Sequence, residues 1–454
     1  MLKIKTDSRK VKKGDTFVAL RGINSDGHDY IESAIKNGAV KIVAEEGNYS
    51  VQTIIVDDSR KYLEELLYNE YKSYLDDMKI VGITGTNGKT TTSYLLYEAL
   101  NKLKVNTSYI GTVGFYKKDK VRDLPNTSPD ICDIYNMLVD SYESGYKTVV
   151  MEVSSQGLSY GRLNKIPFNY AVFTNLTQDH LDYHGTMENY AKAKQQLFYQ
   201  LKKDGISVIN IDDSYHSYYE IGDTRTYGFA SSDYQIKNME LSSFGSSFSV
   251  NDMHIRTSLL GKYNVYNVLC ATIILDLIGF SKDEIERTIP TLTPPPGRMD
   301  MISFHKNTVI IDYAHTPDAM ENIFKTVKEL PHKNIYVVFG CTGSRDAKKR
   351  PIMMQLALNN ADYVVVTSDD LHEEEFENIV KDMLQGNTKG HYKVEKNRME
   401  AVRFALSKLK ENDLLLILGK GHEEFIIVKD ERIPFNDRKA VEQILKEEKM
   451  KIES

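Results

Sequence analysis

Gly82-Ile-Thr-Gly-Thr-Asn-Gly-Lys-Thr-Thr91 is the stretch that decides the fold. A short apolar segment, 80–83, leads into it, and a helical pattern of apolar residues follows over 94–103. A strand, a glycine turn and a helix in this order form a phosphate-binding loop, in which backbone N–H groups and the helix N-terminus hold an anion. Lys89 is predicted to reach the terminal phosphates, and Thr90 to offer its hydroxyl to Mg²⁺. The sequence therefore predicts that the protein binds ATP.

The glycine spacing of this loop is unusual. Measured from Gly82, the loop is one residue longer than the standard GxxxxGK[ST] pattern, and Gly85 is the other candidate for the first glycine. An ordinary glycine turn is the alternative interpretation. Because Gly-Lys-Thr between a strand and a helix is rarely incidental, the phosphate-binding interpretation is favoured.

The composition limits the kind of protein. The chain has 454 residues with 41% apolar and 27% charged content, so about three packed domains are expected. The net charge of −6 argues against nucleic acid as a partner. The three cysteines are widely spaced, which predicts neither disulfides nor a metal site and fits the cytoplasm. No apolar run approaches the roughly 20 residues of a membrane span, so no membrane partner is expected.

Short apolar runs rich in β-branched residues alternate with helical stretches along the chain. They lie at 148–151, 170–173, 206–209, 309–311, 336–339, 363–366 and 414–417. Continuous apolar runs bounded by turn residues are typical of parallel strands that are buried on both faces. The sequence therefore predicts an α/β fold.

Two breaks divide the chain. One lies at 74–78, between a helical segment and the strand that leads to the phosphate loop. The other is Thr293-Pro-Pro-Pro-Gly297, which neither a helix nor a strand tolerates. We therefore predict three domains, 1–78, 79–299 and 300–454.

Three polar positions of the middle segment could carry chemistry. Glu152 ends a predicted strand, and the carboxyl edge of a parallel sheet faces the ligand crevice, so Glu152 suits Mg²⁺; a surface acid is the alternative. His180, in the dense polar run Asp179–His184, is a candidate metal ligand or phosphate contact, with capping and local hydrogen bonding as the alternative. Lys194, on a helix predicted over 190–198, is expected at the surface when taken alone.

The junction after the proline break and the third segment offer further candidates. Arg298 follows the proline break and could stabilise charge on a γ-phosphate when domains close. Asp312 ends a strand and so lies at a similar sheet edge. The turn Gly340–Asp346 lacks G-x-G-x-x-G, so a redox dinucleotide is not expected, and its Arg345 suits a substrate carboxylate. A second turn, Gly419–Glu423, could close over a ligand.

Taken in order, these segments resemble the Mur ligase family, the ATP-dependent amide-forming enzymes of peptidoglycan assembly. The similarity is greatest to the members that add the third residue of the stem peptide, and it covers nearly the whole chain. The ordered set is more specific than any one motif. It consists of Asp7–Arg9, Gly14–Ala19, Gly85–Thr91, Glu152–Ser155, Asp179–His184, Gly261–Asn267, Gly297–Met299, Asp312–Asp318 and Gly419–Glu423.

The resemblance implies an architecture and a set of ligands. A small N-terminal α/β domain would bind the UDP part of the acceptor. A central P-loop-type α/β domain would bind ATP with Mg²⁺, and a C-terminal Rossmann-like domain would bind a free amino acid. The acceptor would be UDP-N-acetylmuramoyl-L-alanyl-D-glutamate, and the enzyme would be a cytoplasmic monomer.

The resemblance also implies residue roles. The acceptor would contact Ser8, Asn126, Thr127, Ser128, Ser154 and Arg162. ATP would contact Gly85, Thr86, Asn87, Gly88, Lys89, Thr90, Thr91, Asn264, Asn267, Arg298 and Asp312. Mg²⁺ would lie near Thr90, Glu152, His180 and Lys194, and the catalytic set would be Lys89, Glu152, His180, Lys194 and Arg298. The amino acid would contact Arg345, Asp369, Asp370, His372, Gly419 and Glu423.

The family resemblance changes the interpretation of Lys194. It stands in a Tyr-x-x-Ala-Lys-x-x-Leu-Phe segment whose lysine is carbamylated in the family, which would give a carboxylate-like group able to bind a second Mg²⁺. ATP would phosphorylate the D-glutamyl carboxylate, the amine of the amino acid would attack the acyl phosphate, and phosphate would leave. The cations and Lys89 would neutralise the charge of phosphoryl transfer, and closure of the C-terminal domain would exclude water.

The match departs from the family pattern at the expected amino-acid site. Members that add diaminopimelate read Asp-Asn-Pro-Arg where this chain has Asp369-Asp-Leu-His372, followed by three glutamates. Losing the arginine removes a bidentate partner for a carboxylate, and the added acids suit a cationic side chain. The sequence therefore favours L-lysine, with ornithine and meso-diaminopimelate as alternatives.

Two other functions stay open. One is a related amide ligase on another γ-carboxylate acceptor, such as a folate or a polyglutamate. Asp7-Ser-Arg9 argues against the folate type, whereas Ser128 and Gln156, which replace a usual threonine and histidine, leave the acceptor open. The other is a non-catalytic paralogue that binds a nucleotide or a partner enzyme; the intact catalytic set argues against it.

Overall fold

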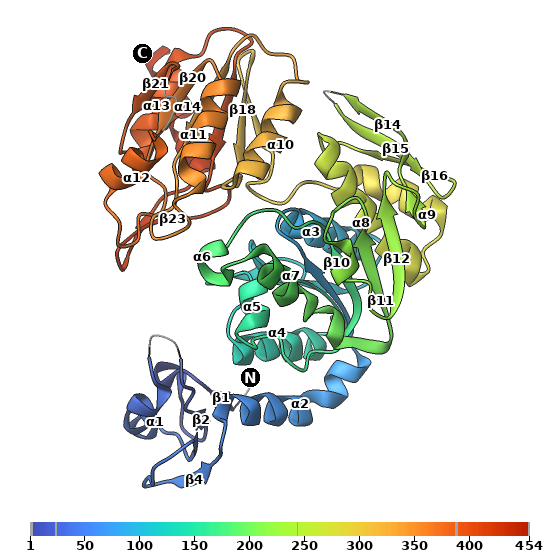
Figure 1. The fold of residues 1–454 in the computed structure, drawn as a ribbon, viewed down its shortest axis with the longest axis vertical. Helices are drawn as coiled ribbons and strands as arrows, with labels where there is room; N and C mark the ends of the chain where they lie inside the picture. The colour runs from blue at the N-terminus through green and yellow to red at the C-terminus, as the bar shows by residue number, and fades with distance from the viewer. Residues whose placement is uncertain (1–2, 23–24, 243, 386–388, 453–454) are drawn as a thin grey trace.

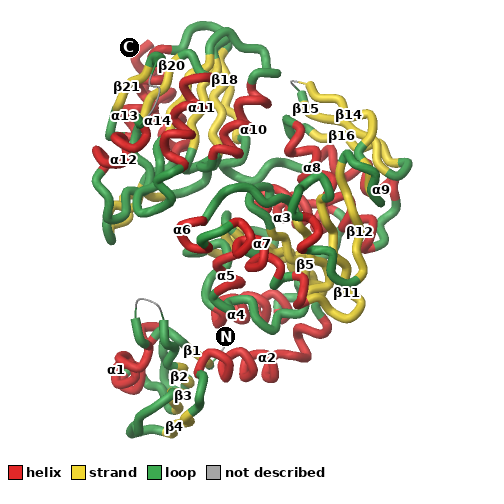
Figure 2. Tube along the Cα trace, in the orientation of Figure 1, coloured by secondary structure: helices red, strands yellow, loops and turns green. Residues whose placement is uncertain are grey.

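The structure is a computed structural model that describes residues 3–22, 25–242, 244–385 and 389–452. Its elements gather in three groups along the chain (Figure 1), and helices cover the sheets in the second and third groups (Figure 2). The predicted α/β class is confirmed. Within the described ranges, no helix is both long and apolar enough to cross a membrane.

The first group is a small parallel sheet with the strand order β1-β2-β3-β4. Its strands are Ile4–Lys5, Thr16–Val18, Lys41–Ala44 and Gln52–Ile55, and its helix α1 spans Ile31–Lys36. The long helix α2, Ser59–Asp77, leads from this sheet to the second group (Figure 1). Leu63 and Leu67 of α2 are fully buried in the core that the two groups share.

The second group is built on a nine-stranded sheet with the order β13-β12-β11-β10-β5-β9-β6-β7-β8. In chain order, β5 to β13 span Lys79–Thr84, Thr107–Gly111, Gly114–Tyr116, Lys120–Arg122, Thr148–Glu152, Phe168–Phe173, Leu201–Asn210, Asp223–Gly228 and Tyr234–Gln235. Its helices α3 to α9 span Lys89–Lys102, Ile131–Glu143, Ser155–Ser159, Leu181–His184, Met187–Gln195, Lys262–Ile278 and Lys282–Thr288. A separate antiparallel sheet, β14 to β16, spans Lys237–Ser242, Gly245–Val250 and Met253–Thr257.

The central strands of the large sheet, β5, β9 and β10, are mostly apolar because both faces of the sheet are covered there. In β5, Ile80 faces the core that contains α4, whereas Val81 and Ile83 face the core that contains α3 and α8. All three side chains are fully buried. This packing explains the continuous apolar runs in the sequence.

The chain changes direction next to β5. From β5 it crosses to β6 on one side, whereas β10 on the other side leads to β11. Loops that leave neighbouring parallel strands in opposite directions open a crevice at the carboxyl edge, where ligands bind. The phosphate loop follows β5 and therefore lies at such a point.

The third group has the sheet order β17-β18-β22-β19-β20-β21, in which only the β17–β18 pair is antiparallel. β17 to β22 span Asp300–Phe304, Asn307–Asp312, Ile335–Phe339, Tyr363–Val366, Tyr392–Val394 and Leu414–Leu418. Helices α10 to α14 span Pro317–Val327, Lys349–Asn360, Phe376–Met383, Arg398–Lys408 and Asp437–Ile452. A hairpin of β23, Phe425–Val428, and β24, Glu431–Pro434, follows β22.

The predicted strands are confirmed, because all seven apolar runs lie within β9, β10, β11, β18, β19, β20 and β22. The helix predicted over 190–198 starts earlier and ends at Gln195. The proline break contains neither a helix nor a strand between Leu292 and Met299. The three domain limits stay a prediction.

Candidate active site

The phosphate loop begins at Gly85. Gly82 lies inside β5, so it is not the first loop glycine. Gly85 and Gly88 have φ of +149° and +84°. A Cβ atom on Gly85 would lie 1.9 Å from the Thr174 hydroxyl, and one on Gly88 would lie 2.4 Å from Asn267 Oδ1. Conformation and space therefore both require glycine at these two positions.

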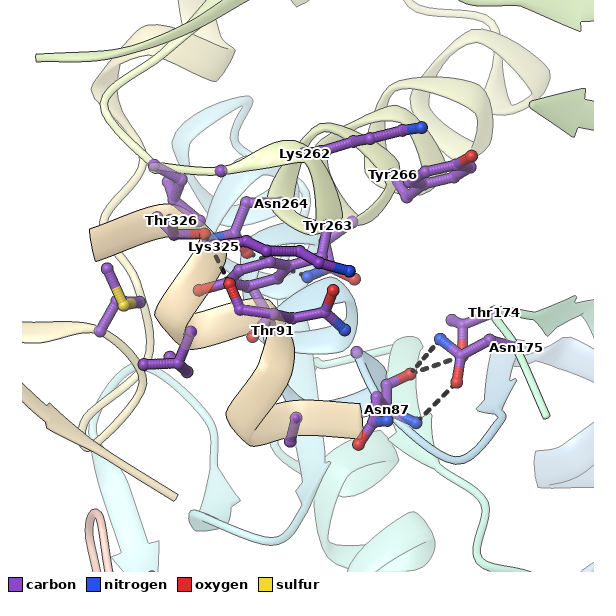
Figure 3. A pocket seen from close by; sticks show the side chains of 18 of the residues that line it. Asn87, Thr91, Thr174, Asn175, Lys262, Tyr263, Asn264, Tyr266, Lys325 and Thr326 are labelled. Atoms are coloured by element: carbon purple, nitrogen blue, oxygen red, sulfur yellow. Dashed lines mark hydrogen bonds between the residues drawn. The ribbon is translucent and has the colours of Figure 1, made fainter. Parts of the chain in front are cut away.

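The loop after β10 holds the phosphate loop in place. Asn87 N donates to Asn175 Oδ1 at 2.9 Å, and the Asn87 carbonyl accepts from Thr174 Oγ1 at 2.7 Å and Asn175 Nδ2 at 3.1 Å (Figure 3). The Asn87 side chain also donates to Asp318 Oδ2 of α10 at 2.6 Å. The loop is thus fixed by the neighbouring strand and contacts the third group directly.

Two lysines, Lys89 and Lys194, donate to the same carbonyl of the phosphate loop. Lys89 Nζ donates to the carbonyls of Gly85 and Thr86 at 2.9 and 2.7 Å, and Lys194 Nζ donates to the Gly85 carbonyl at 2.7 Å. Burial lowers the pKa of both ammonium groups, and that of Lys194 falls well below its ordinary value because Lys89 repels it as well. Lys194 is only 1% exposed, so the surface position expected from its helix alone is wrong.

Glu152 is a buried carboxylate at the end of β9. Its Oε1 accepts from the Tyr109 hydroxyl and from Thr112 N at 2.8 Å, while Oε2 accepts from the hydroxyls of Thr90 at 2.9 Å and Thr112 at 3.0 Å. Glu152 is fully buried, so the surface-acid alternative is wrong. Arg298 donates to the same Thr90 hydroxyl at 3.2 Å and so joins the third group to this site.

Two histidines, His180 and His184, follow β10 and lie in the same part of the site as Lys194. His180 has φ of +53° and its Nε2 lies 3.4 Å from the Asp179 carboxylate, which matches the local pairing considered as its alternative role. Burial lowers the pKa of His180. His184 stacks on Tyr190 with the ring centroids 5.0 Å apart. Its Nε2 lies 2.9 Å from Ser155 Oγ, and burial lowers its pKa to about 4.

A first cavity of about 750 Å³ lies on the outer side of the loop (Figure 3). Asn264 and Asn267 on α8 line it and hydrogen-bond to each other at 3.0 Å. Asp312, at the end of β18, accepts the backbone N–H groups of Met299 and Ala314 at 2.7 and 2.8 Å. Seven of the residues predicted for ATP line this cavity, namely Asn87, Gly88, Thr91, Asn264, Asn267, Arg298 and Asp312.

A second cavity of about 520 Å³ lies on the other side of the loop and shares Asn87, Gly88, Thr91 and Arg298 with the first. It joins the carboxyl edges of the two large sheets. The predicted catalytic residues Lys89, Glu152, His180, Lys194 and Arg298 all line it. So do the residues predicted for the amino acid, namely Arg345, Asp369, Asp370, His372, Gly419 and Glu423.

The residues predicted for the acceptor divide into two sets. Asn126, Thr127, Ser154 and Arg162 line the second cavity, and Ser128 supports them by accepting from Ser154 N at 3.1 Å. Ser8 lies in the first group and lines neither cavity; it is buried and its carbonyl accepts from Asn37 Nδ2 at 2.9 Å. The structure therefore brings Ser8 together with none of the others.

Two buried cations that the sequence analysis did not consider contact residues at the amino-acid end of the second cavity. Lys420 Nζ is fully buried and donates to Asp370 Oδ1 at 2.8 Å and to Glu423 Oε2 at 2.6 Å. Arg350, at 1% exposure, pairs with Glu374 at 2.6 Å and with Asp382 at 2.9 Å. Burial raises the pKa of Glu423 to about 7. Lys420 stands in the recognised Gly419–Glu423 turn, so the motif could have revealed it; no sequence signal reveals Arg350.

The donors near the loop suit Mg²⁺. Thr90 and Glu152 offer hard oxygen atoms at the wall of the second cavity. The buried Arg298 Nε has no hydrogen-bond partner among the described residues, as expected of a group that faces an anionic ligand. Thr90, Glu152 and the neighbouring cations thus fit a magnesium nucleotide.

Sequence profiles match most of the chain. The Mur ligase middle domain matches residues 83–275, the Mur ligase glutamate ligase domain matches 297–421, and the Mur ligase family catalytic domain matches 3–72. The chain belongs to the Mur ligase family. Mur ligases use ATP with Mg²⁺ to form C–N bonds, so the chain is a ligase.

Individual proteins are similar to this chain over nearly its full length. The chain is 39% identical to the UDP-N-acetylmuramoyl-L-alanyl-D-glutamate–2,6-diaminopimelate ligase of Geobacillus thermodenitrificans, over 98% of this chain and 94% of the relative. It is 39% identical to the ligase of the same name from Clostridium botulinum, over 98% and 95%. A solved structure of a ligase with this name is 32% identical and superposes with a TM-score of 0.68, over 98% and 94%. These comparisons favour the diaminopimelate alternative over lysine.

Proposed function

We propose that this Mur ligase adds meso-diaminopimelate to the D-glutamyl γ-carboxylate of UDP-N-acetylmuramoyl-L-alanyl-D-glutamate. One observation carries the proposal: a single cavity is lined by residues 86–91 of the phosphate loop, by four of the six residues expected to hold the acceptor and by all of those expected to hold the amino acid. Such a cavity brings a phosphoryl donor, a carboxylate and an amine together, which is what acyl-phosphate ligation needs.

The side chains of this cavity suggest a separate role for each group in the reaction. Lys89 and Arg298 both line this cavity and would neutralise the charge that develops as the γ-phosphoryl group moves to the carboxylate. Thr90, Glu152 and His180 would hold Mg²⁺, which neutralises phosphate charge when bound. After transfer, the amine of the amino acid attacks the acyl carbon, and phosphate leaves as the C–N bond forms. The buried walls keep water from the acyl phosphate.

The state of Lys194 supports carbamylation. A neutral amine attacks CO₂, whereas an ammonium group does not, and burial beside Lys89 lowers the pKa of Lys194 strongly. The carbamate would place a negative charge next to the Lys89 ammonium group, since both lysines donate to the Gly85 carbonyl. Without the modification, the ammonium groups of Lys194 and Lys89 repel each other. With it, the negative carbamate on Lys194 would attract the Lys89 ammonium group.

The structure weakens the basis of the lysine preference, because two of the acids behind it are paired. That preference treated Asp370 and the following glutamates as free acids. Asp370 is paired with Lys420, and Glu374 with Arg350, so neither offers an unpaired charge to a substrate ammonium group. Relatives named for 2,6-diaminopimelate support the same conclusion.

The test is ATP-dependent phosphate release with the UDP-muramoyl dipeptide and, in turn, meso-diaminopimelate, L-lysine and L-ornithine, with product masses read in parallel. We expect diaminopimelate to give the highest kcat/KM. Turnover with lysine alone would overturn the choice of amino acid. Failure with all three, in protein that binds ATP, would point to another γ-carboxylate acceptor. A Lys89→Ala variant that keeps biological function would instead support a non-catalytic role.

A further inference from the structure

The hairpin β23–β24 is built against the segment that differs from the family pattern. Ile427 of β23 accepts from Leu371 N at 2.7 Å and His372 N at 3.2 Å, and its own N–H donates to Asp370 Oδ1 at 2.9 Å. On the far side of His372, its carbonyl accepts from Lys429 N at 2.7 Å. Four hydrogen bonds therefore hold the hairpin against residues 370–372 as one structural unit.

This unit places a cation in the second cavity. Arg432 of β24 is the cross-strand partner of Ile427, and opposite residues of an antiparallel pair project to the same face. Ile427 and Arg432 both line the cavity, as does His372. The arginine absent from position 372 thus has a counterpart on the neighbouring strand.

The Arg432 guanidinium is available for a ligand. Within the described residues, the exposed Arg432 side chain has no hydrogen bond and no ion pair; its one recorded contact is with the Phe425 ring, 6.0 Å from the guanidinium carbon to the centroid. Of the acids on either side of His372, Asp370 is paired with Lys420 and Glu374 with Arg350. A free guanidinium in a cavity wall suits a carboxylate, which it can bind through two parallel hydrogen bonds.

We propose that Arg432 binds the distal carboxylate of the incoming amino acid and so selects a substrate with two carboxylates over lysine. The inference rests on the proposed function and names the residue that gives it specificity. Arg345 and the Gly419–Glu423 turn are left for the α-amino and α-carboxylate groups that all candidate amino acids share.

The experiment measures steady-state kinetics of the full-length enzyme and of Arg432→Gln. We expect the variant to raise KM for meso-diaminopimelate about ten- to hundredfold, which is the effect of losing a charge-assisted pair. The KM values for ATP, the UDP-muramoyl dipeptide and lysine should change less than about twofold. Glu431→Gln, the neighbouring position on the opposite face of β24, serves as the matched control and should behave as wild type.

A rescue variant separates binding from folding. In Arg432→Gln/His372→Arg the guanidinium returns to the position of the family pattern, and KM for diaminopimelate should recover by at least about half of the loss on a logarithmic scale. An unchanged KM for diaminopimelate in Arg432→Gln would overturn the inference, and so would an equal rise in KM for lysine. If the wild-type enzyme turns over no diaminopimelate, the proposed function fails first, and the variant comparison is not reached.

Discussion

The phosphate loop and the segment 369–372 line the same cavity, but they are built differently. At the loop, the motif residues contact one another: Thr90 donates to Glu152, and Lys89 and Lys194 share one carbonyl. At segment 369–372, the acids Asp369 and Asp370 face Lys420, which lies outside the segment, and the following Glu374 is paired with Arg350. A sequence motif therefore predicts chemistry where the residues of the recognised motifs contact one another. It does not predict the net charge of a pocket whose acids are paired with cations from outside the motif.

The largest expected effect lies at the loop. Lys194→Arg keeps a positive charge near the Gly85 carbonyl but cannot take up CO₂, so we expect kcat to fall about 10³-fold, as in Lys194→Ala. Carbon-13 NMR with labelled bicarbonate should show a carbamate signal in the wild type and none in Lys194→Arg. Full activity of the arginine variant would disprove the carbamate.

The next effect concerns stability at the amino-acid end. Arg350→Ala leaves Glu374 and Asp382 without their buried partner, so the free energy of unfolding should fall by about 3 kcal/mol. Urea denaturation measures it. Lys439→Ala breaks an exposed pair with Glu424 and is the control, with an expected cost below about 1 kcal/mol. Equal costs would show that Arg350 does not neutralise these acids in the way that the structure indicates.

A smaller effect tests the pairing of Asp370. Because Lys420 already neutralises Asp370, Asp370→Asn should change KM for diaminopimelate less than about threefold and should not weaken the use of lysine. Lys420 keeps Glu423 at 2.6 Å in this variant. Competition between the two amino acids, read by product mass, provides the measurement. A tenfold loss of lysine turnover in Asp370→Asn would instead show that Asp370 binds the ammonium group of a substrate.

The sequence predicts much of this molecule for identifiable reasons. Strands buried on both faces give continuous apolar runs, so the α/β class and seven strands are predictable. The burial of Lys194 is not predictable from its helix, because the Gly85 carbonyl that accepts its ammonium group lies far away in the chain. Asp370 likewise looks like a free acid until the fold brings Lys420 against it. Local patterns predict elements, whereas pairing between distant residues needs the structure.

The pH dependence of stability has opposite signs in the two regions. His184, on the phosphate side, has its pKa lowered from 6.5 to about 4, so the unfolded chain binds a proton that the folded chain does not, and stability falls as the pH drops from 6.5 to 4. Glu423, on the amino-acid side, has its pKa raised from 4.5 to about 7, so the folded chain binds the extra proton and stability rises as the pH drops from 7 to 4.5. Between pH 6.5 and 5, His184→Gln should therefore lose less stability than wild type on acidification, and Glu423→Gln should lose more. Each difference should be below about 1.4 kcal/mol per pH unit in urea denaturation at pH 6.5, 6 and 5. The same slope in both variants would mean that the two regions do not hold these protons as the structure indicates.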